Sequence, residues 1–190
     1  MAKIRVISGS ARGRRLKLVP GDITRPITDR VKESLFNILQ QDIPGCVFLD
    51  LFSGTGSVGI EALSRGASFV RFVDKNRPAI NTIKENLKIT GLSINTDILQ
   101  IDAFTLLRRK PDKQFDYVFI APPQYHDLWN KAVELLDSKP DWLVDDGWAV
   151  AQIDPIEYKQ LELVNFTEFD KRKYGSTLLV FFERNIADDG

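Results

Sequence analysis

The sequence predicts an α/β fold built on a mostly parallel sheet that ends in an antiparallel hairpin. From Cys46 onward, short apolar runs alternate with longer stretches of helical period, which is typical of β-α-β units. The last two apolar runs, 162–169 and 177–184, have only the short segment 171–176 between them and should pair as a hairpin. With 190 residues, 43% of them hydrophobic, the chain is long enough to bury one core.

The N-terminal segment predicts a β-hairpin followed by a helix. Residues 3–8 and 15–19 alternate apolar and polar side chains, and an amphipathic helix begins near Thr28. We therefore expect an N-terminal arm at 1–44, an α/β domain at 45–184 and a tail at 185–190.

The α/β domain should contain seven strands and five helices. We expect strands near 47–51, 69–74, 95–101, 115–120, 147–153, 162–169 and 177–184. We expect helices near 57–65, 77–90, 103–109, 126–138 and 155–160.

Basic residues are concentrated at the N-terminus. The whole chain has 26 Lys and Arg against 26 Asp and Glu, but residues 1–34 hold nine basic and three acidic residues. That segment is therefore +6 and the remainder is −6. Such an asymmetry favours an arm that binds a polyanion.

Cysteine and histidine are too few for several kinds of site. Cys46 is the only cysteine, so an intramolecular disulfide is excluded, and with His126 as the only histidine we expect no metal site. We find neither an apolar signal sequence nor a run of the roughly 18 apolar residues that a membrane span needs. These features predict a cytoplasmic protein without a membrane segment.

A glycine loop follows the first strand of the α/β domain. Residues 54–59 fit the pattern G-x-G-x-x-G, which is common in nicotinamide-dinucleotide sites and also in strand–helix turns without a ligand. Glycines at this place let the backbone approach a ligand, and the following helix offers free N–H groups. Asp50 precedes the loop, and its charge suits a cofactor that carries positive charge better than a pyrophosphate.

Two further acids end the next two strands. Asp74 is suited to bond a ribose diol, and Asp102 is suited to bond an adenine amine. Each is also an ordinary choice for a helix N-cap. Because three consecutive strands end in an acid beside a glycine loop, the pattern favours one shared nucleoside pocket.

A second loop, Ala121-Pro122-Pro123-Gln124-Tyr125, follows the strand 115–120. Paired prolines end a strand's hydrogen-bonding and fix the chain. In an open α/β sheet this loop and the glycine loop both lie at the carboxyl edge, where ligands bind. We therefore expect a rigid substrate loop beside the cofactor loop.

These motifs resemble class I S-adenosylmethionine-dependent methyltransferases. Nearly the whole chain resembles the bacterial family that methylates guanine N2 in 16S ribosomal RNA, through the segments 5–9, 12–16, 25–26, 28–39, 50–56, 59–67 and 174–177. The resemblance implies a Rossmann-like methyltransferase sheet and S-adenosylmethionine as cofactor. It implies that the cofactor is bound by Asp50, Phe52, Gly54, Gly56, Asp74 and Asp102.

The substrate loop departs from that family's pattern of Asp or Asn, Pro-Pro, then Tyr or Phe. Ala121 replaces the acid or amide, and Gln124 replaces the aromatic residue. The departure matters because an exocyclic guanine amine is a poor nucleophile until hydrogen-bond acceptors localise its lone pair. The catalytic residues that remain are Pro122, Pro123, Gln124 and Tyr125, with the Pro122 carbonyl as one acceptor and Gln124 or a water as the second. Tyr125, one residue late, can stack on a flipped base, although core packing is an equal explanation for Tyr125 and Trp129.

The arm's arginines are suited to RNA phosphates, because an Arg side chain binds phosphate with two hydrogen bonds. The candidate RNA-binding residues are Arg12, Arg14, Arg15, Arg30 and Lys32. The first three alternatively form a solvated turn, and the last two alternatively cap the cofactor pocket.

The sequence thus predicts a monomeric methyltransferase whose partner is small-subunit rRNA or an assembling 30S particle. Two alternatives stay open: a catalytically weakened RNA-binding or ribosome-assembly protein of the same fold, and a methyltransferase with another nucleic-acid target. A nicotinamide oxidoreductase is disfavoured by Asp50 and by the lack of a hydride-partner constellation.

Overall fold

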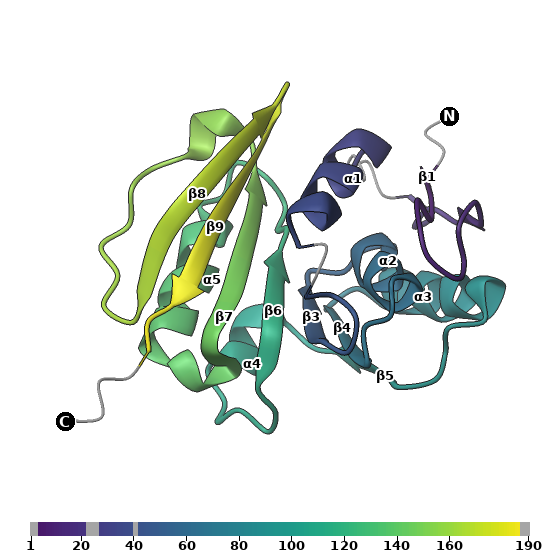
Figure 1. Cartoon of the computed structure of the whole chain (residues 1–190), viewed down its shortest axis with the longest axis horizontal. Coiled ribbons are helices and arrows are strands. Elements are labelled where there is room, and N and C mark those ends of the chain that lie inside the picture. The colour runs from purple at the N-terminus through teal and green to yellow at the C-terminus, as the bar shows by residue number, and fades with distance from the viewer. Residues whose placement is uncertain (1–3, 22–26, 40–41, 187–190) are drawn as a thin grey trace. The chain divides into compact units, whose positions relative to one another are not determined.

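The computed structural model describes residues 4–21, 27–39 and 42–186. The chain divides between Asp102 and Ala103 into two compact units (Figure 1). The first unit contains β1 (Ile4–Arg5), β2 (Arg15–Leu16), α1 (Asp29–Ile38), β3 (Val47–Leu51), α2 (Ser57–Ser64), β4 (Phe69–Asp74), α3 (Arg77–Thr90) and β5 (Thr96–Gln100). The second contains α4 (Ala103–Leu107), β6 (Phe115–Ile120), α5 (Leu128–Ser138), η1 (Pro140–Trp142), β7 (Leu143–Ile153), η2 (Pro155–Glu157), β8 (Phe166–Tyr174) and β9 (Thr177–Arg184).

The larger strands of the first unit are parallel. Their order is β5-β4-β3, and the register sets Asp50 opposite Phe72 and Asp74 opposite Gln100. β3 and β4 are mostly apolar because both of their faces are covered; Phe48 and Phe72, for example, are at most 1% exposed. The parallel pairing brings the carboxyl ends of β3 and β4 to one edge, where the predicted cofactor residues lie.

The second unit ends in the predicted antiparallel hairpin. Its strands run in the order β6-β7-β9-β8, with β6 parallel to β7 and with β9 antiparallel to both β7 and β8. Consequently β6 and β7 end at the same edge, and the turn between β8 and β9 lies at that edge as well. The substrate loop after β6 and the short helix η2 after β7 are therefore neighbours.

Several predicted boundaries were wrong, and the polar contacts explain why. β8 begins at Phe166 and not at 162, because Asp137 accepts the N–H groups of Val164, Asn165 and Phe166 and holds that segment as a loop. The helix expected at 155–160 is a single 3-10 turn, since Tyr158 already has an extended backbone. Among the described residues, the ladder of the N-terminal hairpin pairs Ile4 with Leu16 and Arg5 with Arg15, so it is shorter than predicted.

Two further boundaries differ: β7 begins at Leu143, four residues early, and β8 continues to Tyr174, through most of the segment predicted to connect it to β9. The remaining predictions for the α/β elements agree closely with the structure. No helix in the described part of the chain is long and apolar enough to cross a membrane. Within the same ranges, no group of three or more His, Cys, Asp or Glu side chains is arranged to hold a metal ion.

Candidate active site

The glycine loop leaves β3 and enters α2 through residues with left-handed backbone. Phe52, Gly54 and Gly56 have φ of 68°, 53° and 75°. A Cβ at Gly54 would meet no atom within 4 Å, so this backbone faces open space. A Cβ at Gly59 would lie 2.4 Å from the Phe72 ring, so Gly59 serves the packing of α2 on β4. The loop thus offers accessible backbone at Gly54 and a close helix–sheet contact behind it.

Ser53 fastens the glycine loop to the neighbouring strand. Its hydroxyl donates to the Asp50 carbonyl at 2.6 Å and accepts the Val73 N–H at 2.9 Å. Its own N–H donates to the Val73 carbonyl at 2.9 Å. These bonds hold the loop in shape before any ligand arrives, which reduces the ordering that binding requires.

Asp50 lies beneath the loop and is only 2% exposed. Its Oδ2 accepts the Gly59 N–H at 3.0 Å, which satisfies one of the free donors in the first turn of α2. Burial raises the pKa of the Asp50 carboxyl to about 7, partly opposed by the Gly59 N–H, while Asp74 raises it further. Asp50 is therefore protonated below about pH 7 and carries a negative charge beneath the loop above it.

Asp74 connects the end of β4 to the glycine loop. Its Oδ2 accepts the Gly54 N–H at 2.9 Å and its Oδ1 accepts the Asn76 N–H at 2.8 Å. The side chain is half-buried, and the Ile101 N–H donates to the Asp74 carbonyl at 3.1 Å. Asp102 follows directly and is also half-buried. Asp74 is thus bonded to the glycine loop, and Ile101, the residue before Asp102, is bonded to Asp74.

The substrate loop presents its polar end to solvent. Pro122 is buried, Ala121 is half-buried, and Pro123, Gln124 and Tyr125 are exposed. Tyr125 has φ of 66°, in the left-handed region, and is 65% exposed. Trp129, by contrast, is 1% exposed and stacks on Tyr158 with ring centroids 6.5 Å apart. Core packing is therefore the role of Trp129, whereas Tyr125 remains available to a ligand.

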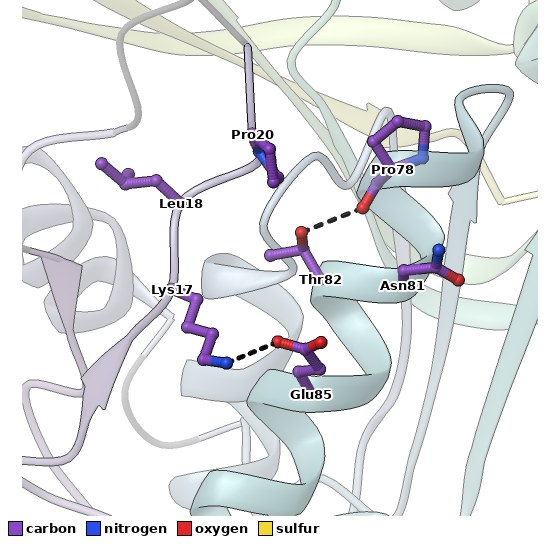
Figure 2. Close-up of a pocket in the computed structure, with 7 residues that line it drawn as sticks. All are labelled: Lys17, Leu18, Pro20, Pro78, Asn81, Thr82 and Glu85. Carbon is purple, nitrogen blue, oxygen red and sulfur yellow. Dashed lines mark hydrogen bonds and ion pairs between the residues drawn. The ribbon is translucent and has the colours of Figure 1, made fainter.

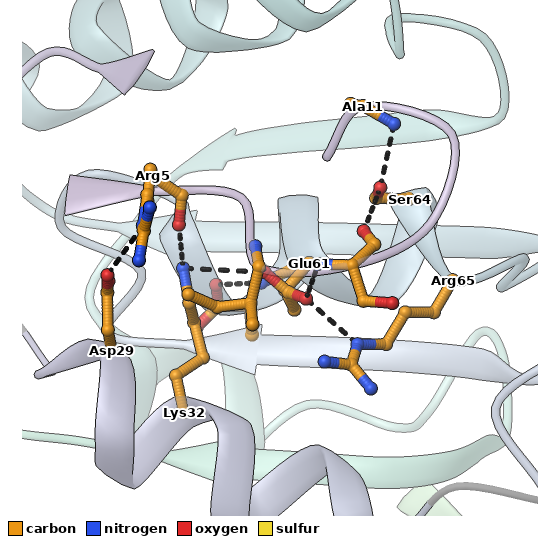
Figure 3. A network of polar contacts seen from close by, with 11 residues as sticks. Arg5, Ala11, Asp29, Lys32, Glu61, Ser64 and Arg65 are labelled. Carbon is orange, nitrogen blue, oxygen red and sulfur yellow. Dashed lines mark hydrogen bonds and ion pairs between the residues drawn. The ribbon is translucent and has the colours of Figure 1, made fainter. Parts of the chain in front are cut away.

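The N-terminal arm is fastened to α2 through the buried carboxylate of Glu61 (Figure 3). Glu61 accepts the Ile7 N–H at 2.8 Å, the Ser8 N–H at 3.0 Å and the Arg65 Nε at 2.8 Å. The Lys32 Nζ lies 3.5 Å from the same carboxylate and donates to the Arg5 carbonyl at 2.6 Å. The sequence did not reveal this structural role of Glu61, although Glu61 lies in the segment 59–67 that resembles the rRNA methyltransferase family.

Lys32 requires a correction. We predicted that it contacts RNA or caps the cofactor pocket, but the side chain is 0% exposed. Burial lowers the pKa of its ammonium, and the Glu61 carboxylate opposes that effect. Burying an ammonium charge is too costly unless an opposite charge such as this carboxylate is paired with it. Lys32 is therefore part of the core that joins α1 to α2, and it does not present a charge to RNA.

The other candidate RNA-binding residues are exposed. Gly9 packs against the end of α2 so closely that a Cβ would lie 1.7 Å from the Ser64 carbonyl oxygen. Ser10 N–H donates to that carbonyl and Ala11 N–H to the Ser64 hydroxyl, at 2.8 and 2.9 Å. That loop, the start of β2 and the first turn of α1 present four exposed side chains that form no ion pair with another described residue: Arg12, Arg14, Arg15 and Arg30.

Asn86 of α3 fastens the arm to the glycine loop. Its amide accepts the Lys17 N–H at 2.7 Å and donates to the carbonyls of Lys17 and Thr55 at 3.1 and 2.9 Å. Next to it, a groove of about 470 Å³ lies between the arm and α3 (Figure 2). The groove is lined by Lys17, Leu18, Pro20, Pro78, Asn81, Thr82 and Glu85. None of the predicted site residues lines this groove.

Comparison with known proteins places the chain in a family. The sequence profile of the family described as "Conserved hypothetical protein 95" matches residues 4–183. The chain belongs to this family. A Bacillus subtilis (strain 168) protein of the name "Putative rRNA methyltransferase YlbH" is 44% identical over 153 residues, 80% of this chain and 83% of that protein. "Ribosomal RNA small subunit methyltransferase D" of Escherichia coli (strain K12) is 35% identical over 145 residues, 76% of this chain and 72% of that protein.

A solved structure resembles the fold of nearly the whole chain. It is described as "Putative methyltransferase yhhF from Escherichia coli", has 29% sequence identity and a TM-score of 0.86, and the match covers 97% of this chain and 99% of that one. Together with the strand pairing, this likeness confirms the predicted class I, Rossmann-like fold.

Proposed function

We propose that this protein transfers a methyl group from S-adenosylmethionine to the N2 amine of a guanine in small-subunit rRNA. The observation that carries the proposal is the preformed glycine loop, with Asp74 bonded to Gly54, in a chain whose relatives carry the names of rRNA methyltransferases. The relative from Escherichia coli is named for the small ribosomal subunit, which supports that substrate.

The residues of the first unit fit S-adenosylmethionine. Open space over Gly54 lets a ligand approach the backbone, and Asp74 supplies a half-buried carboxylate at the loop for ribose hydroxyls. Phe52, Gly56 and Asp102 complete the proposed set of cofactor contacts. When bound, the cofactor supplies an electrophilic methyl group on a positively charged sulfonium, and the Asp50 carboxylate beneath the loop favours that positive charge.

The substrate loop positions the guanine. We propose that the Pro122 carbonyl accepts one N–H of the amine and that the Gln124 amide oxygen accepts the other, because Ala121 has no polar side chain. Pro123 keeps the loop rigid, and the exposed ring of Tyr125 stacks on the base. Methyl transfer depends largely on placing nitrogen, carbon and sulfur in line, so a loop in which Gln124 supplies the acceptor that Ala121 lacks still supports the reaction.

The arm supplies affinity for RNA. Arg12, Arg14, Arg15 and Arg30 are exposed and without ion pairs among the described residues, which suits them to the phosphate backbone. In this proposal the protein acts as a cytoplasmic monomer on rRNA or on an assembling 30S particle. Residues 1–44 act as the RNA-binding arm and 45–184 as the catalytic domain, with 185–190 as a tail.

Ala121 favours one other function, a ribosome-assembly protein of the same fold that binds RNA and cofactor but transfers methyl slowly or not at all. The deciding experiment is tritiated methyl incorporation into 16S rRNA from a strain that lacks the endogenous enzyme, followed by nucleoside analysis. Label in N2-methylguanosine is expected. Label in another nucleoside would refute the guanine N2 assignment, and RNA binding without label would favour the assembly protein. In a parallel thermal-shift titration, Asp74→Ala should weaken stabilisation by S-adenosylmethionine.

A further inference from the structure

The short helix η2 holds the substrate loop by two side chains. Glu157 Oε1 accepts the Tyr125 N–H at 2.6 Å, and Asp154 Oδ2 accepts the Tyr125 hydroxyl at 3.0 Å. Nothing in the sequence pattern connects these acids with the loop, because they lie 32 and 29 residues further along the chain. The parallel pairing of β6 with β7 brings the two segments together.

Both acids are themselves fixed. Asp154 Oδ1 accepts the Ile156 N–H at 3.0 Å, and Glu157 Oε2 accepts the Asp154 N–H at 3.4 Å, so the two form a capping box around η2. Each carboxylate uses one oxygen for its own turn and the other for Tyr125. The loop is therefore bonded to a rigid partner.

The loop needs such a partner because its backbone is strained. Tyr125 and Asp127 have φ of 66° and 50°, a region that side chains other than glycine seldom adopt. The two bonds from η2 hold Tyr125 in this conformation.

The bonds leave the Tyr125 ring uncovered. Although both its N–H and its hydroxyl are bonded, Tyr125 is 65% exposed, and Ile156 of η2 is 82% exposed. An exposed aromatic ring held by two bonds suits a nucleobase, which stacks on aromatic faces, and Ile156 adds an exposed apolar group on the helix that holds the ring.

We propose that Asp154 and Glu157 are positioning residues that fix Tyr125 as a stacking platform for the target nucleobase, with Ile156 as a second apolar contact. The proposal rests on the proposed function, since it identifies the element that holds the base of that same site. The two acids also fix a loop in which Ala121 supplies no polar side chain.

The first test measures the contact without using activity. The Asp154 carboxylate raises the pKa of the Tyr125 phenol by accepting its hydrogen bond and by charge repulsion. The difference in phenolate absorbance between wild type and Tyr125→Phe during a pH titration isolates this phenol. In Asp154→Ser, whose shorter hydroxyl can still cap η2, the phenol should titrate at a lower pH. An unchanged titration would overturn the inference, whatever the enzyme's activity.

The second test is a double-mutant cycle in single-turnover methylation of 16S rRNA at saturating RNA. Tyr125→Phe and Asp154→Ser should each lower the rate about tenfold, as expected for one hydrogen bond to a charged group. The double variant should be no slower than either single variant, because both remove the same bond. RNA affinity and cofactor affinity should hardly change, which a general loss of structure would not produce. Losses that multiply would overturn the inference.

A matched pair of variants tests Ile156. Ile156→Ser should lower the single-turnover rate, whereas Ile94→Ser, at a site that is 79% exposed in the first unit, should not. Equal effects would remove Ile156 from the proposal. If the wild-type protein transfers no methyl group to rRNA, the proposed function fails, and the phenol titration still decides whether η2 holds the loop.

Discussion

Replacing Asp50 by asparagine should make the protein more stable at alkaline pH. Burial raises the pKa of the Asp50 carboxyl from 3.8 to about 7. The folded protein therefore holds this proton more tightly than the unfolded chain does. The resulting stabilisation of the folded state is fully present at pH values below 3.8 and is lost as the pH rises through about 7.

The size of the effect follows from that interval. It spans about three pH units, and each unit corresponds to about 1.4 kcal/mol, so the ionised carboxylate makes the folded state less stable by roughly 4 kcal/mol. Asparagine retains an oxygen for the Gly59 N–H and has no proton to lose. The variant should therefore escape this loss.

Urea unfolding of wild type and Asp50→Asn across a series of pH values measures the difference directly. The free energy of unfolding of the variant minus that of wild type should grow by up to about 4 kcal/mol between about pH 4 and pH 9. The same variant should gain less stabilisation from S-adenosylmethionine, because the charge beneath the loop is gone. A difference that is constant with pH would mean that the Gly59 N–H keeps Asp50 ionised throughout, and would refute the reasoning.

Four further outcomes are expected. Replacing Arg12, Arg14 and Arg15 together by alanine should reduce the slope of log K against log salt concentration for rRNA binding by up to about three. The control variant, with alanine at the exposed Arg108, Arg109 and Lys110, should keep the wild-type slope. Lys32→Met should destabilise the protein by about 3 kcal/mol in urea, since it leaves the buried Glu61 without its lysine, yet it should not change that salt dependence. Ala121→Asn should raise the single-turnover methylation rate more than RNA affinity, and Gln124→Leu should lower it; a slower Ala121→Asn enzyme would mean that another acceptor is used. Gly59→Ala should cost about 1–3 kcal/mol in urea unfolding because its Cβ would overlap the Phe72 ring, and an unchanged midpoint would show that α2 can shift.

The α/β elements were predictable because their signals are local. β3, β4, β6 and β9 appear as short apolar runs, and α3 has a clear helical stripe ended by Gly91. The errors arise where side chains distant in sequence decide the backbone. Asp137 determines where β8 begins, and a stripe of apolar residues at 162–169 cannot reveal a carboxylate 25 or more residues earlier.

The candidate site shows the same division. The positions of Asp50, Asp74 and the glycines followed from strand ends, but the burial of Asp50 and the packing role of Gly59 depend on the neighbouring helix and strand. We predicted that Lys32 contacts RNA or caps the cofactor pocket, because a lysine beside arginines on a basic segment is usually exposed. Only the fold reveals that Glu61, on another helix, is its partner.

The contacts of the N-terminal arm also determine the order in which the chain can fold. The Ile7 N–H donates to Glu61, which lies 54 residues later, and the Lys17 N–H donates to Asn86, which lies 69 residues later. Closing such long loops is entropically unfavourable until α2 and α3 have formed, so we expect the arm to be the last part of the first unit to become ordered. The most basic segment of the chain is therefore expected to become ordered late. A brief protease pulse during refolding should accordingly cleave the arm after the glycine loop has become resistant.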